Sequence, residues 1–226
     1  MSKFRNWLEE HFGIPTDKVD DVATRKIAPS TSKKSGEFHV LRVQPTPNPN
    51  AFQFVINVPI IASGTKTFEN ADDAKGDSFA EALFQIYGVE SVYLKESFVT
   101  ITKSETIGWH AIFEKIGETI ESKIQYYDTL NDEEITGETS ATILDKFHKE
   151  DFPNCNEKEK TLIVEAMLDQ AIRPALANDG GGVDVLGIEG NVIKVHYQGA
   201  CGTCPSSTTG TLDYIETLLK DTLHSD

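Results

Sequence analysis

The hydrophobic spacing of this chain of 226 residues is regular in two stretches and irregular between them, and this break constrains the fold. Regular spacing covers residues 37–125 and residues 157–226. Residues 126–156 are acidic or small and polar, with no apolar period, so we interpret them as an acidic linker. Residues 1–36 begin with apolar residues at helical spacing and end in a polar stretch, which predicts an amino-terminal extension with a short amphipathic helix. The chain is therefore expected to form two small domains.

The spacing in residues 37–125 predicts a sheet with helices on it. From Phe52 to Val58, apolar residues alternate with polar or smaller ones, as in a half-buried strand. Two prolines in Thr46-Pro-Asn-Pro-Asn50 forbid sheet pairing and predict a rigid turn, and a partner surface is the alternative interpretation. The further elements expected are strands at 38–43, 89–94 and 98–102, and helices at 77–86 and 107–124.

The spacing in residues 157–226 predicts a helix, two strands and a second helix. Apolar residues recur every fourth position from Ile163 and predict a helix that ends near Asn178, where Asp179 caps the helix end or turn. Strands are expected at 183–188 and 192–197, and a final helix at 212–223. The fold class expected for the whole chain is α/β, in the broad sense that includes α+β, with two small domains.

Composition and charge exclude several functions. The chain has 36 acidic residues against 21 Lys and Arg, a formal charge of −15 that would repel a phosphate backbone, so no nucleic-acid partner is expected. It has no run of 18 apolar residues, so no membrane span is expected. Three cysteines are too few for a disulfide scaffold and fit a reducing compartment. The start, with Glu9 and Glu10, lacks the pattern of a secretory or transit segment, which predicts a cytoplasmic location, with the mitochondrial matrix as the alternative.

The feature that carries chemistry is the pair Cys201 and Cys204, between the last predicted strand and the last predicted helix. Their spacing brings two sulfurs close enough to hold one metal ion or one edge of a cluster. Pro205 suits a first helical turn, whose free N–H groups favour the thiolate form that binds metal. Gly199 and Gly202 allow the backbone to curl around the pair.

Four interpretations of the pair remain open on the residues alone. Two unliganded thiols are one, and a thioredoxin-like redox pair is another, although only 22 residues follow Cys204, too few for the rest of that fold. Structural zinc and an iron–sulfur cluster are the other two. Both usually need four ligands, so both predict a second cysteine pair from a second chain on a two-fold axis.

Two motifs in the carboxy-terminal stretch resemble a known family. The segments Ile172-Arg-Pro-Ala-Leu-Ala-Asn-Asp-Gly-Gly181 and Gln198-Gly-Ala-Cys-Gly-Thr-Cys-Pro-Ser-Ser207 resemble the carboxy-terminal domain of NifU-like (Nfu) proteins. Residues 39–124, with Gln44-Pro-Thr-Pro-Asn-Pro-Asn-Ala51, resemble the amino-terminal domain that some Nfu proteins carry. The family loop usually has its glycine directly before the second cysteine, whereas here Thr203 follows Gly202. Gly182 stands where an acidic residue is usual.

The resemblance implies an iron–sulfur cluster scaffold or carrier, and not an enzyme. It implies that Cys201 and Cys204 of each of two subunits hold a bridging 4Fe–4S cluster, which is passed to recipient apo iron–sulfur proteins. The implied partners are a second copy of the chain on cluster binding, the recipients, and upstream cluster assembly proteins. The alternative function is a dithiol–disulfide oxidoreductase that uses the same pair.

Two residues outside the pair are weighed as neighbours of the site. Cys155 stands alone, 46 residues before Cys201, and is interpreted as an incidental thiol, with an auxiliary ligand during transfer as the alternative. His196 precedes the cysteine loop on the same predicted strand and is the histidine expected nearest to the site.

Overall fold

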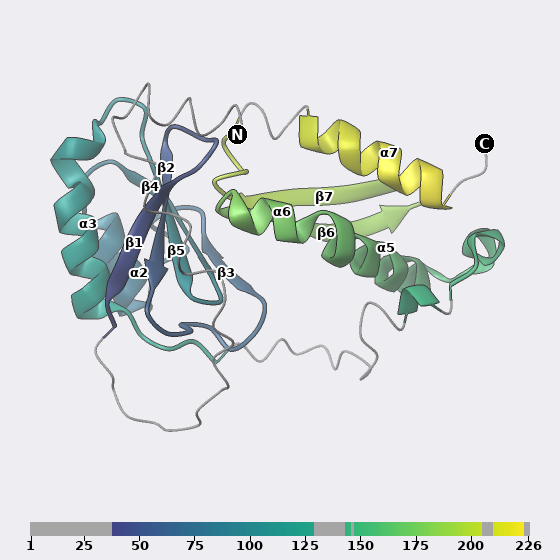
Figure 1. Cartoon of the computed structure of the whole chain (residues 1–226), viewed down its shortest axis with the longest axis horizontal. Coiled ribbons are helices and arrows are strands. Elements are labelled where there is room, and N and C mark those ends of the chain that lie inside the picture. The colour runs from purple at the N-terminus through teal and green to yellow at the C-terminus, as the bar shows by residue number, and fades with distance from the viewer. Residues whose placement is uncertain (1–37, 129–142, 146, 205–209, 224–226) are drawn as a thin grey trace, which may run out of the picture. The chain divides into compact units, whose positions relative to one another are not determined.

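The computed structural model describes residues 38–128, 143–145, 147–204 and 210–223. They form an amino-terminal domain built on a sheet and a carboxy-terminal domain built on a strand pair with helices, which confirms the predicted fold class (Figure 1). The predicted extension and most of the predicted linker, residues 129–142, lie outside the described residues. The predicted domain boundaries therefore stay predictions.

The amino-terminal sheet has five antiparallel strands in the order β1-β2-β5-β4-β3. The sequence missed β3, because its four residues Thr-Lys-Thr-Phe contain a single strongly apolar side chain. The strands are β1 (Val40–Pro45), β2 (Ala51–Ile56), β3 (Thr65–Phe68), β4 (Val89–Lys95) and β5 (Phe98–Lys103).

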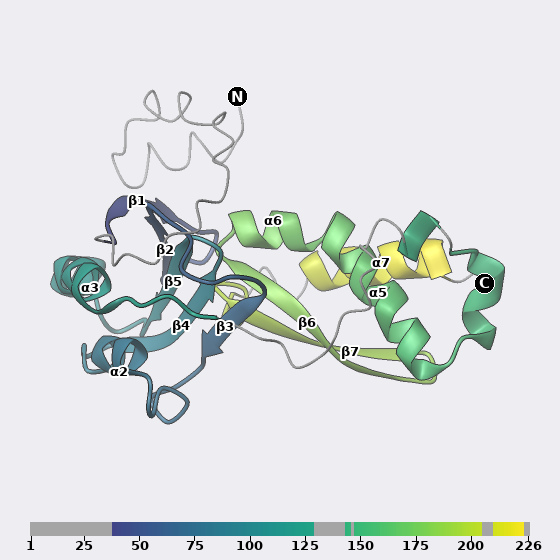
Figure 2. The same ribbon diagram turned by 90° about the horizontal axis from the view of Figure 1, so that it is seen from below.

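Two helices, α2 (Ser78–Phe84) and α3 (Trp109–Lys123), cover one face of this sheet (Figure 2). Asp77 caps α2, since its side chain accepts hydrogen bonds from the backbone N–H groups of Phe79 and Ala80. Apolar side chains from α3 and from alternate strand positions form the main core. Its fully buried members include Phe54, Val92, Leu94, Val99, Ile101, Ile116 and Ile120.

The carboxy-terminal domain packs helices on the hairpin β6 (Gly181–Glu189) and β7 (Val192–Gly199). The single helix predicted up to Asn178 is wrong. The structure has α5 (Glu157–Ala171) and α6 (Arg173–Asn178), because Pro174 has no N–H to donate and its ring clashes with the carbonyl four residues earlier. The remaining elements are the 3₁₀ helix η2 (Lys149–Asn154) and α7 (Leu212–Leu223).

The second face of the five-stranded sheet is also buried. Gln53, Thr100 and Tyr93 are register partners across β2, β5 and β4, so they form one row on the face opposite the helices. Their exposed fractions are 5%, 1% and 0%, respectively. Gln53 donates to the carbonyl of Ala177 at 3.1 Å, so the carboxy-terminal domain contacts this face. Consistently, Glu37–Asp226 form one compact unit.

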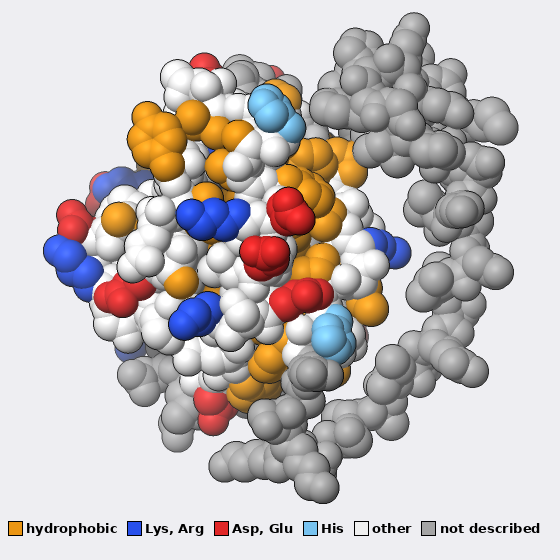
Figure 3. All heavy atoms as spheres, turned by 90° about the vertical axis from the view of Figure 1, so that its left-hand side faces the viewer, with side chains coloured by type: hydrophobic (Ala, Val, Ile, Leu, Met, Phe, Trp, Pro, Cys, Tyr) orange, Lys and Arg blue, Asp and Glu red, His pale blue; other side chains and the backbone are white. Residues whose placement is uncertain are grey.

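The surface view of the amino-terminal side mixes charges of both signs, with hydrophobic side chains between them (Figure 3). On this face, the acidic excess of the sequence does not form a single field. Within the described part of the chain, no helix is both long enough and apolar enough to cross a membrane.

Candidate metal centre

The cysteine loop, residues 199–204, continues β7 as a series of tight turns. The N–H of Cys201 donates to the carbonyl of Gln198 at 3.3 Å, and that of Gly202 donates to the carbonyl of Gly199 at 3.1 Å. The N–H of Cys204 donates to the carbonyl of Cys201 at 3.4 Å. Gly199 takes a φ of 61°, a left-handed value that favours glycine, so its predicted role in curling the loop is confirmed.

The first glycine of β6 makes room for one sulfur of the pair. A Cβ atom on Gly181 would lie 2.5 Å from the Sγ of Cys201 and 2.6 Å from the carbonyl oxygen of Gln198. No real side chain fits at such distances, so the Asp-Gly-Gly segment is part of the cysteine site. From the sequence, these glycines were interpreted as a turn that ends a helix. The signal available for their role was that their segment and the cysteine motif carry the family resemblance together.

Both sulfur-bearing residues are buried, with exposed fractions of 2% for Cys201 and 3% for Cys204. Cys201 packs into the carboxy-terminal core with residues such as Leu168 and Val183. Pro205, which the sequence places in a first helical turn, lies outside the described residues, so the predicted helix start beside the sulfurs stays a prediction.

Two tyrosines border the pair and stay neutral near it. Burial raises the pKa of the Tyr93 hydroxyl, and the negative charges of Asp184 and Cys201 raise it further. Burial also raises the pKa of Tyr197, with Cys201 as a second cause. At neutral pH both phenols therefore keep their protons, and neither adds negative charge beside thiolates.

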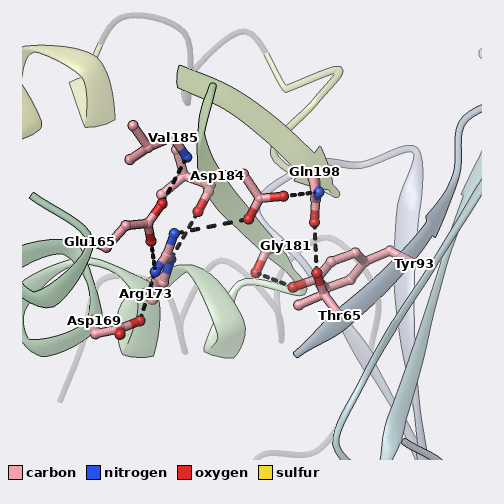
Figure 4. Close-up of polar contacts among 10 residues, drawn as sticks. Thr65, Tyr93, Glu165, Asp169, Arg173, Gly181, Asp184, Val185 and Gln198 are labelled. Atoms are coloured by element: carbon pink, nitrogen blue, oxygen red, sulfur yellow. Dashed lines mark hydrogen bonds and ion pairs between the residues drawn. The ribbon is translucent and has the colours of Figure 1, made fainter. Parts of the chain in front are cut away.

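Arg173, from the Arg-Pro motif, fixes the helices to the strand that supports Cys201 (Figure 4). Its Nη1 lies 2.5 Å from Glu165 and 2.8 Å from Asp169, and its Nε donates to the carbonyl of Val183 at 2.9 Å. Burial alone would lower the Arg173 pKa, but the hydrogen bonds to both carboxylates outweigh it, and the pKa is raised. The guanidinium therefore ties α5 and α6 to β6.

The other predicted candidates do not join the pair. Cys155 follows η2, where its Sγ donates to the carbonyl of Asp151 at 3.4 Å, and burial with the nearby charges of Glu159 and Asp151 raises its thiol pKa. His196 points its Nε2 at Glu69 of the amino-terminal domain. Among the described residues, no group of three or more His, Cys, Asp or Glu side chains is arranged to hold a metal ion.

Sequence reasoning also did not assign Asn48 to the site. Asn48, in the Thr46–Asn50 turn, donates from Nδ2 to the carbonyl of Ala200 at 3.0 Å and to the hydroxyl of Thr203 at 2.9 Å. Both acceptors belong to the cysteine loop. The available signal was an asparagine held between two prolines, in a segment predicted as a rigid turn or a partner surface but not as a neighbour of this loop.

Profiles of two protein families match the chain. The profile described as "Scaffold protein Nfu/NifU N terminal" matches residues 41–127. The profile described as "NifU-like domain" matches residues 164–226. Together they account for both described domains.

Similar proteins are known from plants, insects and yeast. The chain is 28% identical over 181 residues to NifU-like protein 4, mitochondrial, of Arabidopsis thaliana, covering 79% of this chain and 61% of the relative. It is 29% identical over 182 residues to the NFU1 iron-sulfur cluster scaffold homolog, mitochondrial, of Drosophila sechellia, covering 80% of this chain and 60% of the relative. The chain thus spans about three fifths of the length of these curated relatives.

A solution NMR structure of a NifU-like protein from Saccharomyces cerevisiae is similar at 22% identity and a TM-score of 0.38, covering 49% of this chain and 99% of that one. Both profiles match in one chain, and the relatives align across most of its length. The chain therefore belongs to the family of Nfu-type proteins.

Proposed function

We propose that this chain is a scaffold and carrier for a 4Fe–4S cluster, which it holds through Cys201 and Cys204 and passes to apo iron–sulfur proteins. Relatives named as iron–sulfur cluster scaffolds support the scaffold role. The observation that carries the proposal is the placement of the pair. A loop of tight turns holds both cysteines, and the glycine at 181 leaves space for one of the sulfurs.

The ligand count favours a site shared between two copies. A 4Fe–4S cluster is usually held by four thiolates, and this loop supplies two. A second copy related by a two-fold axis would supply the other two. Each chain would then hold half of the ligands, which favours a cargo that can be released, because no single chain encloses it.

Carrying a cluster needs binding and release and no bond-making step on a substrate, so the proposal assigns no catalytic residue. Tyr93 and Tyr197 suit this role, since neutral phenols bordering the loop do not repel an anionic cluster–thiolate unit. The basic residues Lys66, Lys103 and Arg173 are not assigned a role at the cluster, because ion pairs or hydrogen bonds within the fold already engage them.

The test is anaerobic reconstitution of the metal-free chain with iron and sulfide, followed by measurement of iron, labile sulfide, zinc and mass. We expect a brown dimer with about four irons per two chains. Cys201→Ser and Cys204→Ser variants should each lose the cluster, while Cys155→Ser should keep it. A colourless dimer that binds only zinc would contradict the proposal, as would a metal-free monomer that reduces insulin disulfides.

Transfer is tested separately, by mixing the loaded chain with an apo ferredoxin of the 4Fe–4S class and following the recipient's spectrum. Delivery faster than from free iron and sulfide supports a carrier. Delivery at the same rate as from free iron and sulfide would indicate a scaffold that stores its cluster and not a carrier.

The location and partners also remain proposals. The relatives' names include the word mitochondrial, which favours the mitochondrial matrix over the predicted cytoplasm. Fractionation of cells that express the full-length protein decides between them. The upstream assembly proteins and the recipients are expected to be found in that same compartment.

A further inference from the structure

The turn at residues 46–50 is held rigid from several sides. The hydroxyl of Thr46 donates to the carbonyls of Asn48 and Ala51, at 2.9 and 3.0 Å. The Nζ of Lys103 donates to Oδ1 of Asn50 at 2.9 Å, and the indole N–H of Trp109 donates to the carbonyl of Pro49 at 3.1 Å. Because these bonds stay within the amino-terminal domain, they hold the turn without a contribution from the other domain.

This rigid turn aims one amide at the cysteine loop. The Oδ1 of Asn48 accepts from the N–H of Asn50 at 2.9 Å, which fixes the direction of the side chain. Its Nδ2 then reaches Ala200 and Thr203, one on each side of Cys201. Asn48 is only 2% exposed, so the contact is a packed one.

Tyr93 makes the second contact, and it depends on glycines. A Cβ on Gly182 would lie 2.7 Å from the Tyr93 hydroxyl, and a Cβ on Gly199 would lie 2.9 Å from its ring. The hydroxyl itself lies 3.4 Å from the carbonyl of Gly181 (Figure 4). The absence of a side chain at Gly182 therefore makes room for the Tyr93 hydroxyl.

The interface is closely packed but not fully matched in polarity. On the sheet face that carries Tyr93, the hydroxyls of Thr67, Thr100 and Thr102 are buried and have no hydrogen-bond partner among the described residues. Buried polar groups without partners oppose the buried state. Among the described residues, these three hydroxyls add no hydrogen bond that would hold the two domains together.

The burial of Cys201 and Cys204 determines whether a second chain can reach their sulfurs. Cysteines exposed by only 2% and 3% cannot meet the sulfurs of a second chain around one cluster. We propose that Asn48 and Tyr93 form a clamp that holds the cysteine loop closed, and that the amino-terminal domain must release the loop before two copies share a cluster. The proposal rests on the proposed function for its cargo, but the clamp itself is tested without any cluster.

The first experiment measures thiol access in the metal-free chain. In a Cys155→Ser background, the loop thiols are alkylated anaerobically with iodoacetamide and counted by mass spectrometry. Asn48→Asp keeps the acceptor for Asn50 but cannot donate to Ala200, so we expect alkylation to become about tenfold faster. Asn57→Asp is the matched control, because it keeps the oxygen that accepts from the N–H of His39, and its rate should not change. Equal rates for both variants would overturn the clamp.

The second experiment uses the glycine contact and does not depend on the first. Gly182→Ala places a methyl group against the Tyr93 hydroxyl and should speed alkylation by a similar factor. Adding Tyr93→Phe removes that hydroxyl and leaves the ring carbon 3.5 Å from the new Cβ, an ordinary contact, so the slow rate should return. A double variant as fast as Gly182→Ala alone would refute the contact, and circular dichroism checks that each variant is folded.

The third experiment asks whether loading opens the clamp. Hydrogen–deuterium exchange of peptides covering β4 and β5 is compared between the metal-free and the reconstituted chain. Iron content is measured first, so a chain that binds no cluster counts against the proposed function alone. If the chain is loaded and the protection of these strands is unchanged, release does not occur and the proposal fails. Faster exchange on loading is the expected result.

Discussion

Replacing Arg173 with Ala tests how the cysteine loop is supported. The guanidinium is 18% exposed and is close to two carboxylates, with Nη1 2.5 Å from Glu165 and 2.8 Å from Asp169. Its Nε also satisfies the carbonyl of Val183, on the strand that begins beside Cys201. The variant removes all of these contacts and leaves the carboxylates facing one another.

The magnitude follows from the exposure of each group. The Val183 carbonyl loses its partner in a part-buried place, which costs ~1–2 kcal/mol, and hydrogen bonds to a charged group contribute ~1.5–3 kcal/mol. The carboxylates of Glu165 and Asp169 are 30% and 45% exposed, so solvent screens the charge interaction, and we discount it. We expect the free energy of unfolding to fall by about 3 kcal/mol.

Urea unfolding followed by circular dichroism measures this change. With a slope of ~2 kcal/mol per molar urea, the midpoint of the carboxy-terminal transition should fall by roughly 1.5 M. Arg173→Lys keeps the charge but loses the planar fork, so it should give an intermediate value. Lys220→Ala removes an exposed pair with Glu216 and should change stability by less than about 0.5 kcal/mol. If Arg173→Ala costs no more than Lys220→Ala, the network does not support the hairpin and the reasoning is refuted.

Three further changes test other contacts. Gly181→Ala places a methyl group on the Cys201 sulfur and should abolish cluster loading in the reconstitution assay, and normal iron content would contradict this. Cys155→Ala should load and deliver cluster at the normal rate, and a slower rate would revive its role as an auxiliary ligand. Burial lowers the pKa of Lys103 below 10.5, so the unfolded chain binds its proton more tightly, and the free energy of unfolding should rise as pH rises toward 10.5. Lys103→Met should remove this rise in urea titrations.

Most elements could be predicted because their patterns are local. Alternation in β2, the apolar stripe of α3 and the hairpin β6-β7 follow from side-chain periods of two and 3.6 residues, which any stretch of sequence displays by itself. The break at Pro174 was also local, but the apolar period continues across it and hid the break. β3 is a strand because Thr67 pairs with Tyr93, a partner that its own four residues do not reveal.

By itself, the sequence identified the candidate ligands, Cys201 and Cys204, and predicted that one chain supplies half of a site. A cysteine pair three positions apart needs no tertiary contact to be recognised. Only the tertiary structure decided that both sulfurs are buried and that Asn48, 152 positions before Ala200, holds their loop. The reason is physical, because an amide, a phenol and three glycines become one contact only when two separately patterned domains pack together. In the sequence, each has an ordinary local role as turn, strand or loop residue.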